Sequence, residues 1–486
     1  MDQEDQDLQQ HVARDGSSWT EIGNNIPIMS SSAENIVHVS PGPAVASKRK
    51  VKCELSSFLQ ILDESVFRKL HKHTVAHANA ANDHEFFVTL EDIYAFVGLL
   101  YARGVFVAKN EPLHSLWSLE YGRNFFRSTM PRNKFQFIMK HLRFDDQSTR
   151  AERRTYDKFC PIRDIWIRLI ENSQAAYNPT FHLTVDEQLF PMKSRCPFIQ
   201  FIPTKPDKYG VKFWILCDAE KRYIFNGYPY LGKVETEDRN GVQLGEFVTM
   251  KLLEPYYKGG YSVSTDYFFT SLKLSNRLLA KNITLVGTMK RNRREIPSIL
   301  QHSRSTTVGS VIGVKHVSSK TCLFSYKAKK EKTVIMLSLL HTNIQMSDYK
   351  PEVIHFYNQT KYRVDTVDQM ARKYSTKSSS RRWPFQVFCN ILDLSAINAH
   401  TLYRDVTNSI ESRRNFLISL SKKLTSFVRN VTCDMPIPRN PSQTPPSLKR
   451  VKCKICRKNC TRSSCSRCNR FVCGTCTVVV CTNCDC

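Results

Sequence analysis

The stretch "GYSVSTDYFFTSLKLSNRLLAKNITLVGTM" (260–289) decides the fold class of this chain. Its first residues alternate between apolar and polar side chains up to Thr265, a period typical of a β-strand, and Asp266 ends the alternation. A leucine-rich segment with helical spacing follows, and "ITLVGTM" (283–289) then predicts a second strand. Two strands joined through a helix indicate a crossover in an α/β sheet. The chain therefore places a carboxylate where the first of these strands ends.

Three further strands are predicted upstream of this unit. They are "FHLTVDEQLF" (181–190), "VKFWILCD" (211–218) and "RYIFNGYPYLG" (222–232), separated by short turns. Closely spaced strands favour an antiparallel meander, whereas the later strands join through helices, of which "GEFVTMKLLEPYY" (245–257) is the first. This order of elements is that of an RNase H-like nuclease core, which we expect over residues 181–289.

Helical and irregular segments flank the predicted core. The stretch "TLEDIYAFVGLLYARG" begins with a capping box of Thr89 and Asp92 and carries apolar residues at helical spacing. The residues after the core are basic and less regular, which we interpret as an inserted β-rich domain. The polar, serine-rich N-terminus predicts disorder. The predicted order is a disordered tail (1–52), a helical region (53–180), the core (181–289), the insertion domain (290–353), a last core helix (354–369), a second helical part (370–432), a Pro-rich linker (433–450) and a Cys-rich domain (451–486).

The charge of the chain indicates a polyanionic partner. Lys and Arg number 71 against 44 Asp and Glu, which gives a net charge of +27. Nucleic acid is the first expectation. A membrane surface is the second, but no apolar run of about 18 residues and no basic amphipathic anchor is present. The acidic N-terminus carries no secretory signal, and the basic cluster "SKRKVK" (47–52) predicts nuclear import.

Carboxylates lie where catalytic metal ligands would be expected. Asp186 in "LTVDEQ" and Asp266 are expected at the ends of predicted strands, and Asp365 in "YRVDTVDQM" is a third candidate, with Asp368 on the same helix face. Such a set can hold two Mg²⁺ ions, the arrangement that cleaves phosphodiesters in many nucleases. An Asp at a strand end can also be only a cap or a turn residue, and spacing alone does not identify the third ligand.

The C-terminal segment predicts zinc binding. Of the 17 cysteines, 10 lie within residues 451–486. Two thiolates at CxxC spacing suit one half of a tetrahedral zinc site. Adjacent pairs are too close for sequential sites, so we expect a cross-brace in which pairs one and three share one Zn²⁺ and pairs two and four share the other. Cys460 and Cys486 receive no role. The four pairs are Cys453/Cys456, Cys465/Cys468, Cys473/Cys476 and Cys481/Cys484.

A RING-type ubiquitin ligase also uses cross-brace zinc, but two features disfavour that reading. The span from Cys453 to Cys484 is short, and the segment is strongly basic. Basic residues such as Arg457 and Lys458 suit phosphate contacts, so we expect this domain to bind DNA.

Several motifs together resemble the piggyBac transposases, from about residue 90 to the C-terminus. They are "LTVDEQ", "SRCPFIQFIPTKPDKYGVK", "NGYPYLG", "LVGTMKRNRREIP", "YNQTKYRVDTVDQM" and "RRWPF". The resemblance implies an RNase H-like core of DDD type that is interrupted by an insertion domain. It also implies cut-and-paste DNA transposition at TTAA sites, with hairpin ends as intermediates and excision without a footprint. The expected partners are transposon ends and TTAA target DNA, bound by a homodimer through the flanking helical region.

The resemblance assigns individual residues. Asp186, Asp266 and Asp365 match the three metal-binding aspartates of the family, and Asp368 matches a further acidic residue on the same helix. Lys290 and Arg293 match basic positions that face DNA. The family has a similar C-terminal finger in which one ligand is usually His, and Cys476 takes that place here. The chain departs from the family before "VDT", where Tyr362 and Arg363 replace the usual pair of glycines.

Three functions remain open from the sequence. The first is an active DNA transposase. The second is a domesticated descendant that binds DNA without moving it, and the third is a zinc-dependent interaction protein of chromatin. All four aspartates are present, which favours the first reading modestly. The presence of transposon ends beside the gene would discriminate between the first two.

Overall fold

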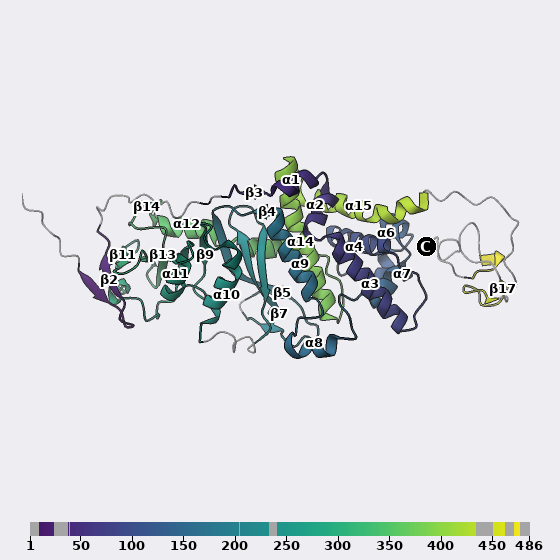
Figure 1. Ribbon diagram of the computed structural model, residues 1–486, viewed down its shortest axis with the longest axis horizontal. Coiled ribbons are helices and arrows are strands. Elements are labelled where there is room, and N and C mark those ends of the chain that lie inside the picture. Colours follow the sequence, from purple (N-terminus) through teal and green to yellow (C-terminus); the bar gives the residue numbers. More distant parts are fainter. Residues whose placement is uncertain are drawn as a thin grey trace, which may run out of the picture.

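A computed structural model describes residues 9–23, 37, 39–203, 205–232, 241–433, 451–461 and 471–476. A large mixed sheet occupies one half of the long molecule, and helices occupy the other half (Figure 1). Among the described helices, none is long and apolar enough to cross a membrane.

The strands of the expected core form the middle of the sheet. Neighbouring strands follow the order β8-β7-β5-β9-β10. The first three pair antiparallel, whereas β5 pairs parallel with β9 and β9 pairs parallel with β10. The predicted meander and crossovers are therefore confirmed. The strands are β5 (His182–Pro191), β7 (Tyr209–Asp218), β8 (Ile224–Pro229), β9 (Ser262–Thr265) and β10 (Thr284–Met289).

Two helices make the crossovers. α10 (Leu244–Leu253) leads through a short 3-10 turn, Glu254–Tyr256, to β9, and α11 (Leu272–Leu279) leads from β9 to β10. The hydroxyl of Ser271 caps α11 by accepting the N–H of Leu274 at 3.1 Å. At Gly287 of β10, a Cβ would lie 2.2 Å from the hydroxyl oxygen of Thr270. Glycine is therefore required where β10 passes the end of β9.

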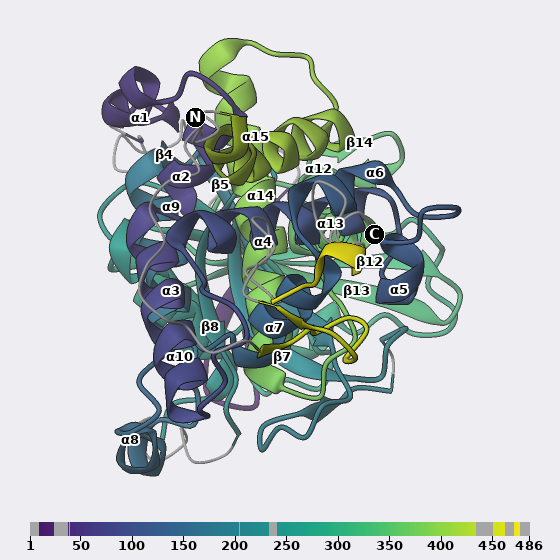
Figure 2. The same cartoon turned by 90° about the vertical axis from the view of Figure 1, so that its right-hand side faces the viewer.

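Helices from both sides of the core pack into one bundle. Figure 2 shows α2, α4, α14 and α15 grouped at the helical end of the molecule. α4 is buried along its length, and a Cβ at Gly98 would lie 2.8 Å from a methyl carbon of Thr425 on α15. The predicted capping box of Thr89 and Asp92 is present at its start. The helices of the bundle are α2 (Glu54–Ile61), α3 (Glu64–Ala80), α4 (Leu90–Val105), α7 (Arg132–His141), α9 (Arg163–Ala176), α14 (Trp383–Thr407) and α15 (Arg413–Cys433).

Shorter elements complete the described fold. α12 and α13 follow the β-rich segment and lie against the sheet. These elements are α1 (Val45–Lys50), α5 (Leu113–Leu116), α6 (Asn124–Thr129), α8 (Arg150–Tyr156), α12 (Glu352–Thr360), α13 (Arg363–Lys373), β3 (Gly42–Pro43), β4 (Tyr177–Asn178), β6 (Gln200–Phe201), β14 (Met346–Ser347), β15 (Lys350–Pro351), β16 (Val451–Lys452) and β17 (Cys460–Thr461).

The β-rich segment expected as an insertion domain continues the core sheet. β13 (Lys332–Ser338) pairs antiparallel with β10, and β12 (Cys322–Lys329) and β11 (Val311–His316) follow outward. Val286 of β10 packs in one apolar cluster with Phe324 and Met336 of the added strands. The expected β content is present, but these strands use the open edge of β10 rather than forming a sheet of their own.

The prediction of a disordered tail over residues 1–52 is wrong for residues 9–23 and 39–52. β1 (Gln10–Val12) and β2 (Ser18–Glu21) form a hairpin, and β2 pairs with β11 at the end of the sheet (Figure 1). Trp19 is fully buried and its ring meets that of His316 at 4.9 Å. The basic cluster of the predicted import signal lies largely in helix α1. The burial of Trp19 fixes the hairpin to β11, and the polar composition of the segment did not predict this contact.

We expect Trp19→Ala to release the N-terminal hairpin. Truncation of a buried aromatic side chain costs about 3–5 kcal/mol, which is more than a two-stranded edge hairpin contributes alone. Hydrogen exchange should therefore become faster in β11, while β5 and β9 stay protected. Val12→Ala is the control, because Val12 is 66% exposed. Unchanged protection of β11 in the Trp19 variant would show that the hairpin is held by other contacts.

A buried histidine predicts a pH-dependent stability. Burial lowers the pKa of His182 to about 4, and its ring lies 4.7 Å from that of Phe356. The folded chain therefore keeps His182 neutral, whereas the unfolded chain protonates it below its usual pKa of about 6.5. The contribution to the free energy of unfolding is present above pH 6.5 and falls by up to about 1.4 kcal/mol per pH unit as the pH drops toward 4.

Urea unfolding of His182→Gln across pH 4.5–7 tests this expectation. The difference in free energy of unfolding between wild type and variant should shrink as the pH falls. His114→Gln serves as the control for the substitution itself, because His114 is exposed. Parallel curves for the His182 variant would contradict the assignment.

Candidate active site

Asp186 and Asp266 lie side by side at the centre of the sheet. In the parallel pair of β5 and β9, Val185 is in register with Thr265. Each aspartate is the next residue along its chain, and neighbouring strands lie about 4.8 Å apart. The register therefore places the two aspartates on neighbouring strands. Asp266 directly follows β9, as expected, whereas Asp186 lies within β5 and not at its end, because the strand continues to Pro191.

Burial and neighbouring negative charge raise the pKa of both carboxyl groups. For Asp186, burial is the largest cause, and the charges of Glu187, Asp266 and Asp365 add to it and hold the pKa well above its usual value. For Asp266, burial and the charge of Glu187 raise the pKa, although Lys212 and the N–H of Phe268, at 2.8 Å, oppose the rise. The two side chains thus form a site of concentrated negative charge.

A seam of polar contacts ties helices α12 and α14 to this part of the sheet. The hydroxyl of Thr184 on β5 donates to the carbonyl of Thr360 at the end of α12, at 2.8 Å. Ser264 on β9 bonds the hydroxyl of the same Thr360 at 2.6 Å. Gln188 accepts an N–H from Asn390 of α14 at 3.0 Å. Thr184 and Gln188 share the strand face of Asp186, because side chains alternate along a strand.

Helix α13 begins directly beyond this seam and brings Asp368 to the same face. The amide of Gln188 donates to Asp368 at 3.2 Å, and Arg372 pairs with Asp368 at 2.8 Å. Burial is the largest influence on Asp368 and raises its pKa, although Arg372 and Gln188 act against the rise. The carboxylate of Asp368 is therefore fixed by two contacts, one with Arg372 of α13 and one with Gln188 of β5, the strand that also carries Asp186.

Asp365 lies one turn earlier on α13 and is more open. Its side chain is 64% exposed, and the amine of Lys205 lies 3.7 Å from its carboxylate and 3.8 Å from that of Glu187. Burial alone would lower the pKa of Lys205, but these carboxylates raise it. The aspartates do not form a set of three ligand atoms within 4.8 Å of one another; in the described residues only a cysteine cluster does so. The amine of Lys205 lies between the carboxylates of Glu187 and Asp365 and offsets their negative charge.

The departure from the family glycines causes no backbone strain. Tyr362, the N-cap of α13, has φ of −88°, and Arg363 is not among the residues with positive φ. Arg363 instead donates to the carbonyl of Ala219 at the end of β7. A side chain at this turn therefore adds a contact between α13 and the sheet.

Lys290 and Arg293 lie beside the Asp266 turn. The amine of Lys290 lies 5.1 Å from the ring centre of Tyr267. Arg293 donates to the carbonyl of Thr270 at 3.1 Å, and Arg14 of the N-terminal hairpin donates to the carbonyl of Arg293 at 3.2 Å. These cations border the carboxylate site, with the hairpin bracing their loop.

Several residues of the site were not identified from the sequence. Glu187 follows Asp186 directly, and Lys205 and Lys212 lie in the segment between β5 and β7 or on β7. Burial lowers the pKa of Lys212, whose amine lies 3.7 Å from the ring centre of Trp214. The only available signal was the acidic pair in "VDEQ". Gln188 was not predicted, because a polar residue in a strand ordinarily faces solvent.

The C-terminal segment brings together Cys453, Cys456 and Cys473, with ligand atoms all within 4.8 Å. The sulfurs of Cys456 and Cys473 are 3.7 Å apart, and a tetrahedral zinc with Zn–S bonds of about 2.3 Å separates its ligands by about 3.8 Å. These thiols come from pairs one and three, as the cross-brace predicts. Cys460 is exposed and outside the cluster. Cys465, Cys468, Cys481 and Cys484 and the side chain of Cys476 lie outside the described residues.

The basic residues predicted in this segment are Arg457 and Lys458. Both are exposed, and Arg457 has a positive φ of 56° beside the knuckle that starts at Cys453. The amide of Arg457 donates to the carbonyl of Cys453 at 3.0 Å. Their side chains are therefore presented outward from the turn that positions the first cysteine pair.

Comparisons with known proteins agree with this geometry. The family model described as Transposase IS4 matches residues 53–400. The human PiggyBac transposable element-derived protein 3 is 23% identical over 371 residues, which is 71% of this chain and 60% of that protein. The human PiggyBac transposable element-derived protein 2 is 22% identical over 343 residues, 65% of this chain and 56% of that protein. The chain thus spans 60% or less of the length of these relatives.

A solved structure extends the likeness to almost the whole fold. The cryo-EM structure of a piggyBac transposase synaptic complex with hairpin DNA superposes with a TM-score of 0.77 and 30% identity, covering 92% of this chain and 100% of that chain. Because the family model covers most of the chain and the structural match covers nearly all of it, this protein belongs to the Transposase IS4 family and is of the piggyBac type.

Proposed function

We propose that this protein is a DNA transposase that excises and integrates DNA at TTAA sites by a cut-and-paste route. The observation that carries the proposal is the register of β5 and β9, which sets Asp186 beside Asp266, with Asp365 and Asp368 on α13 near the same site. The likeness to a piggyBac transposase bound to hairpin DNA supports the choice of substrate.

The catalytic core is an RNase H-like fold of DDD type. The order β8-β7-β5-β9-β10, with two parallel pairings after an antiparallel meander, supports this assignment. In this reading the strands β11 to β13 are the inserted part, and α12 and α13 return the chain to the core. The helical segments 53–180 and 370–432 bind DNA and form a homodimer on it.

The carboxylates fit two Mg²⁺ ions. Burial raises the pKa values of Asp186, Asp266 and Asp368, and the charge of Glu187 adds to the rise at Asp186 and Asp266. A bound cation would offset the cost of burying these charges, and carboxylate oxygens are the ligands that Mg²⁺ prefers. Asp186, Asp266 and Asp365 would hold the ions. When bound, two such ions supply an activated oxygen nucleophile and stabilise the leaving oxygen of a phosphodiester.

The protein's own residues prepare the site. Lys205 balances the charge of Glu187 and Asp365, while Arg372 and Gln188 fix the orientation of Asp368. Lys290 and Arg293 bind the phosphate backbone beside Asp266, and Arg457 and Lys458 bind phosphates from the cysteine-rich domain. That domain holds two Zn²⁺ ions, and the basic segment 47–52 directs the protein to the nucleus.

The alternative is a domesticated protein that binds DNA without cutting it. The curated human relatives are named as transposable element-derived proteins, which favours keeping this reading in the test. The test is an excision assay on a plasmid that carries the genomic flanks of the gene between TTAA sites. Precise restoration of one TTAA supports transposase activity. DNA binding without excision supports the domesticated reading.

A further inference from the structure

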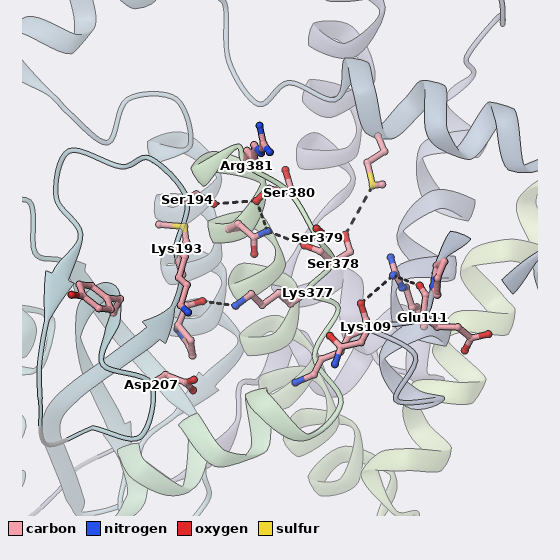
Figure 3. Close-up of a pocket in the computed structure, with 18 of the residues that line it drawn as sticks. Lys109, Glu111, Lys193, Ser194, Asp207, Lys377, Ser378, Ser379, Ser380 and Arg381 are labelled. Atoms are coloured by element: carbon pink, nitrogen blue, oxygen red, sulfur yellow. Dashed lines mark hydrogen bonds between the residues drawn. The ribbon is translucent and has the colours of Figure 1, made fainter. Parts of the chain in front are cut away.

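A basic cleft of about 1080 Å³ lies between the helical bundle and the end of the core sheet. Most of its lining comes from four segments: 109–113 after α4, 191–194 at the end of β5, 206–209 at the start of β7, and the serine-rich segment 377–381 before α14. Arg103 of α4, Met139 of α7 and Gln386 of α14 complete it. Figure 3 shows Lys377, Lys193 and Arg381 around this cleft, with Lys109 across from them. The cleft combines side chains from parts of the chain that are far apart in sequence.

The cleft carries cations whose charge is not cancelled within it. Both acidic residues of its lining pair with arginines outside it: Glu111 with Arg123 at 3.1 Å and Asp207 with Arg372 at 2.6 Å. By contrast, the exposed cations make no ion pair with a carboxylate in the described part of the chain. These exposed cations are Lys109, Lys193, Lys208 and Arg381.

Internal hydrogen bonds hold the walls of the cleft in place. The amine of Lys377 donates to the carbonyl of Pro191 at 2.5 Å, and Ser194 donates to the carbonyl of Ser380 at 3.0 Å. Gln386 of α14 donates to the same carbonyl at 3.1 Å. Arg103, which is 6% exposed, holds the opposite wall by donating to the carbonyls of residues 108, 109 and 111. The serine-rich segment is thereby fixed to the end of β5, so the cleft is formed before any ligand binds.

Ion pairs and one strand link the cleft to the candidate carboxylate site, although none of the four aspartates lines the cleft. Pro191 in its lining ends β5, the strand that carries Asp186. Lys205 contacts Asp365, and Asp207, two residues further on, lines the cleft. Arg372 joins the two regions because it pairs with both Asp207 and Asp368. A polyanion in the cleft would therefore extend toward the candidate carboxylate site.

We propose that this cleft binds the phosphodiester backbone of one DNA strand next to the bond that is cut. The inference rests on the proposed function, since it assigns a further contact for the same substrate. The four exposed cations contact successive phosphates, and the hydroxyl of Ser379 and its serine neighbours donate to phosphate oxygens. Such contacts position the strand without reading its sequence.

The test compares two variants of the full-length protein that lose the same charge. The cleft variant replaces Lys109, Lys193, Lys208 and Arg381 with Gln. The control variant replaces four exposed lysines outside the cleft with Gln, namely Lys273, Lys281, Lys329 and Lys330. Affinity for a TTAA-containing duplex and for a random duplex is measured over a salt series, and circular dichroism checks folding.

We expect the cleft variant to bind both duplexes more weakly and with a smaller salt dependence. The slope of log affinity against log salt should fall by about 0.9 for each lost phosphate contact, and so by about 3 to 4 in all, whereas the control variant should stay within about one unit of wild type. Equal slopes for the two variants would overturn the cleft proposal and leave the proposed function standing. If wild-type protein binds DNA but fails the excision assay described above, the proposed function falls, and the slopes still decide whether the cleft binds DNA.

Discussion

Asp186→Asn and Asp266→Asn should each reduce strand cleavage to less than about one thousandth of wild type while leaving DNA affinity nearly unchanged. The two carboxylates lie in register on neighbouring parallel strands, and each keeps the shape of its side chain in the variant. What is lost is one negative charge of the site that we propose holds cations at a phosphodiester, and loss of one charge-stabilising group commonly costs about 10²–10³-fold or more. Asp365→Asn should behave in the same way, and Asp368→Asn should be harmful but less complete.

Cleavage of a TTAA-flanked donor and binding to the same DNA are measured side by side. Asp348→Asn is a matched control, because Asp348 is exposed and its positive φ of 45° suits Asn as well as Asp. Full cleavage by any one of the aspartate variants would remove that residue from the site. Loss of binding together with cleavage would mean that the substitution damaged the fold.

Removal of zinc should abolish the preference for transposon ends without unfolding the core. Cys453 is buried, receives the N–H of Cys473 at 3.3 Å, and belongs to the thiol cluster of Cys453, Cys456 and Cys473. A segment as short as 451–486 buries too little surface to fold alone, and zinc commonly contributes about 10–16 kcal/mol to such modules. Cys453→Ser, chelation, or truncation after Arg450 should therefore all have the same effect.

The measurement is the ratio of affinities for end DNA and random DNA over a salt series. Loss of the folded domain should lower this ratio and reduce the salt slope by about one unit for each lost phosphate contact. Cys460→Ser is the control, since Cys460 is exposed and lies outside the cluster. An unchanged ratio and slope in Cys453→Ser would make a protein-partner role for this domain the better account.

Local patterns predicted the centre of the fold well. Alternation of side chains located β5, β7, β8, β9 and β10, because period two is a direct consequence of the pleat. The same pattern placed Asp266 at the end of its strand. Side-chain alternation does not specify which strands pair. The neighbouring positions of Asp186 and Asp266 therefore follow from the parallel register of β5 and β9 in the structure.

Contacts between distant segments explain what the sequence did not reveal. The hairpin around Trp19 looked disordered because its local composition is polar, yet one tryptophan is buried against β11. The attachment of the β-rich segment to the core sheet was not predicted, because β13 joins the edge of β10 through backbone hydrogen bonds that side-chain periodicity does not record. Lys205 was likewise not predicted, because a lysine ordinarily lies on the surface, and only the fold places it between Glu187 and Asp365.

Iron-mediated cleavage of the protein backbone tests directly whether Asp186, Asp266 and Asp365 hold metal ions. Fe²⁺ replaces Mg²⁺ in zinc-loaded protein, and ascorbate with peroxide then generates hydroxyl radicals that cut the chain beside the bound ion. We expect cuts near Asp186, near Asp266 and in the first turn of α13, all suppressed by excess Mg²⁺ and absent in Asp186→Asn. Cuts that fall elsewhere, or that persist unchanged in Asp186→Asn, would contradict a metal centre built from these aspartates.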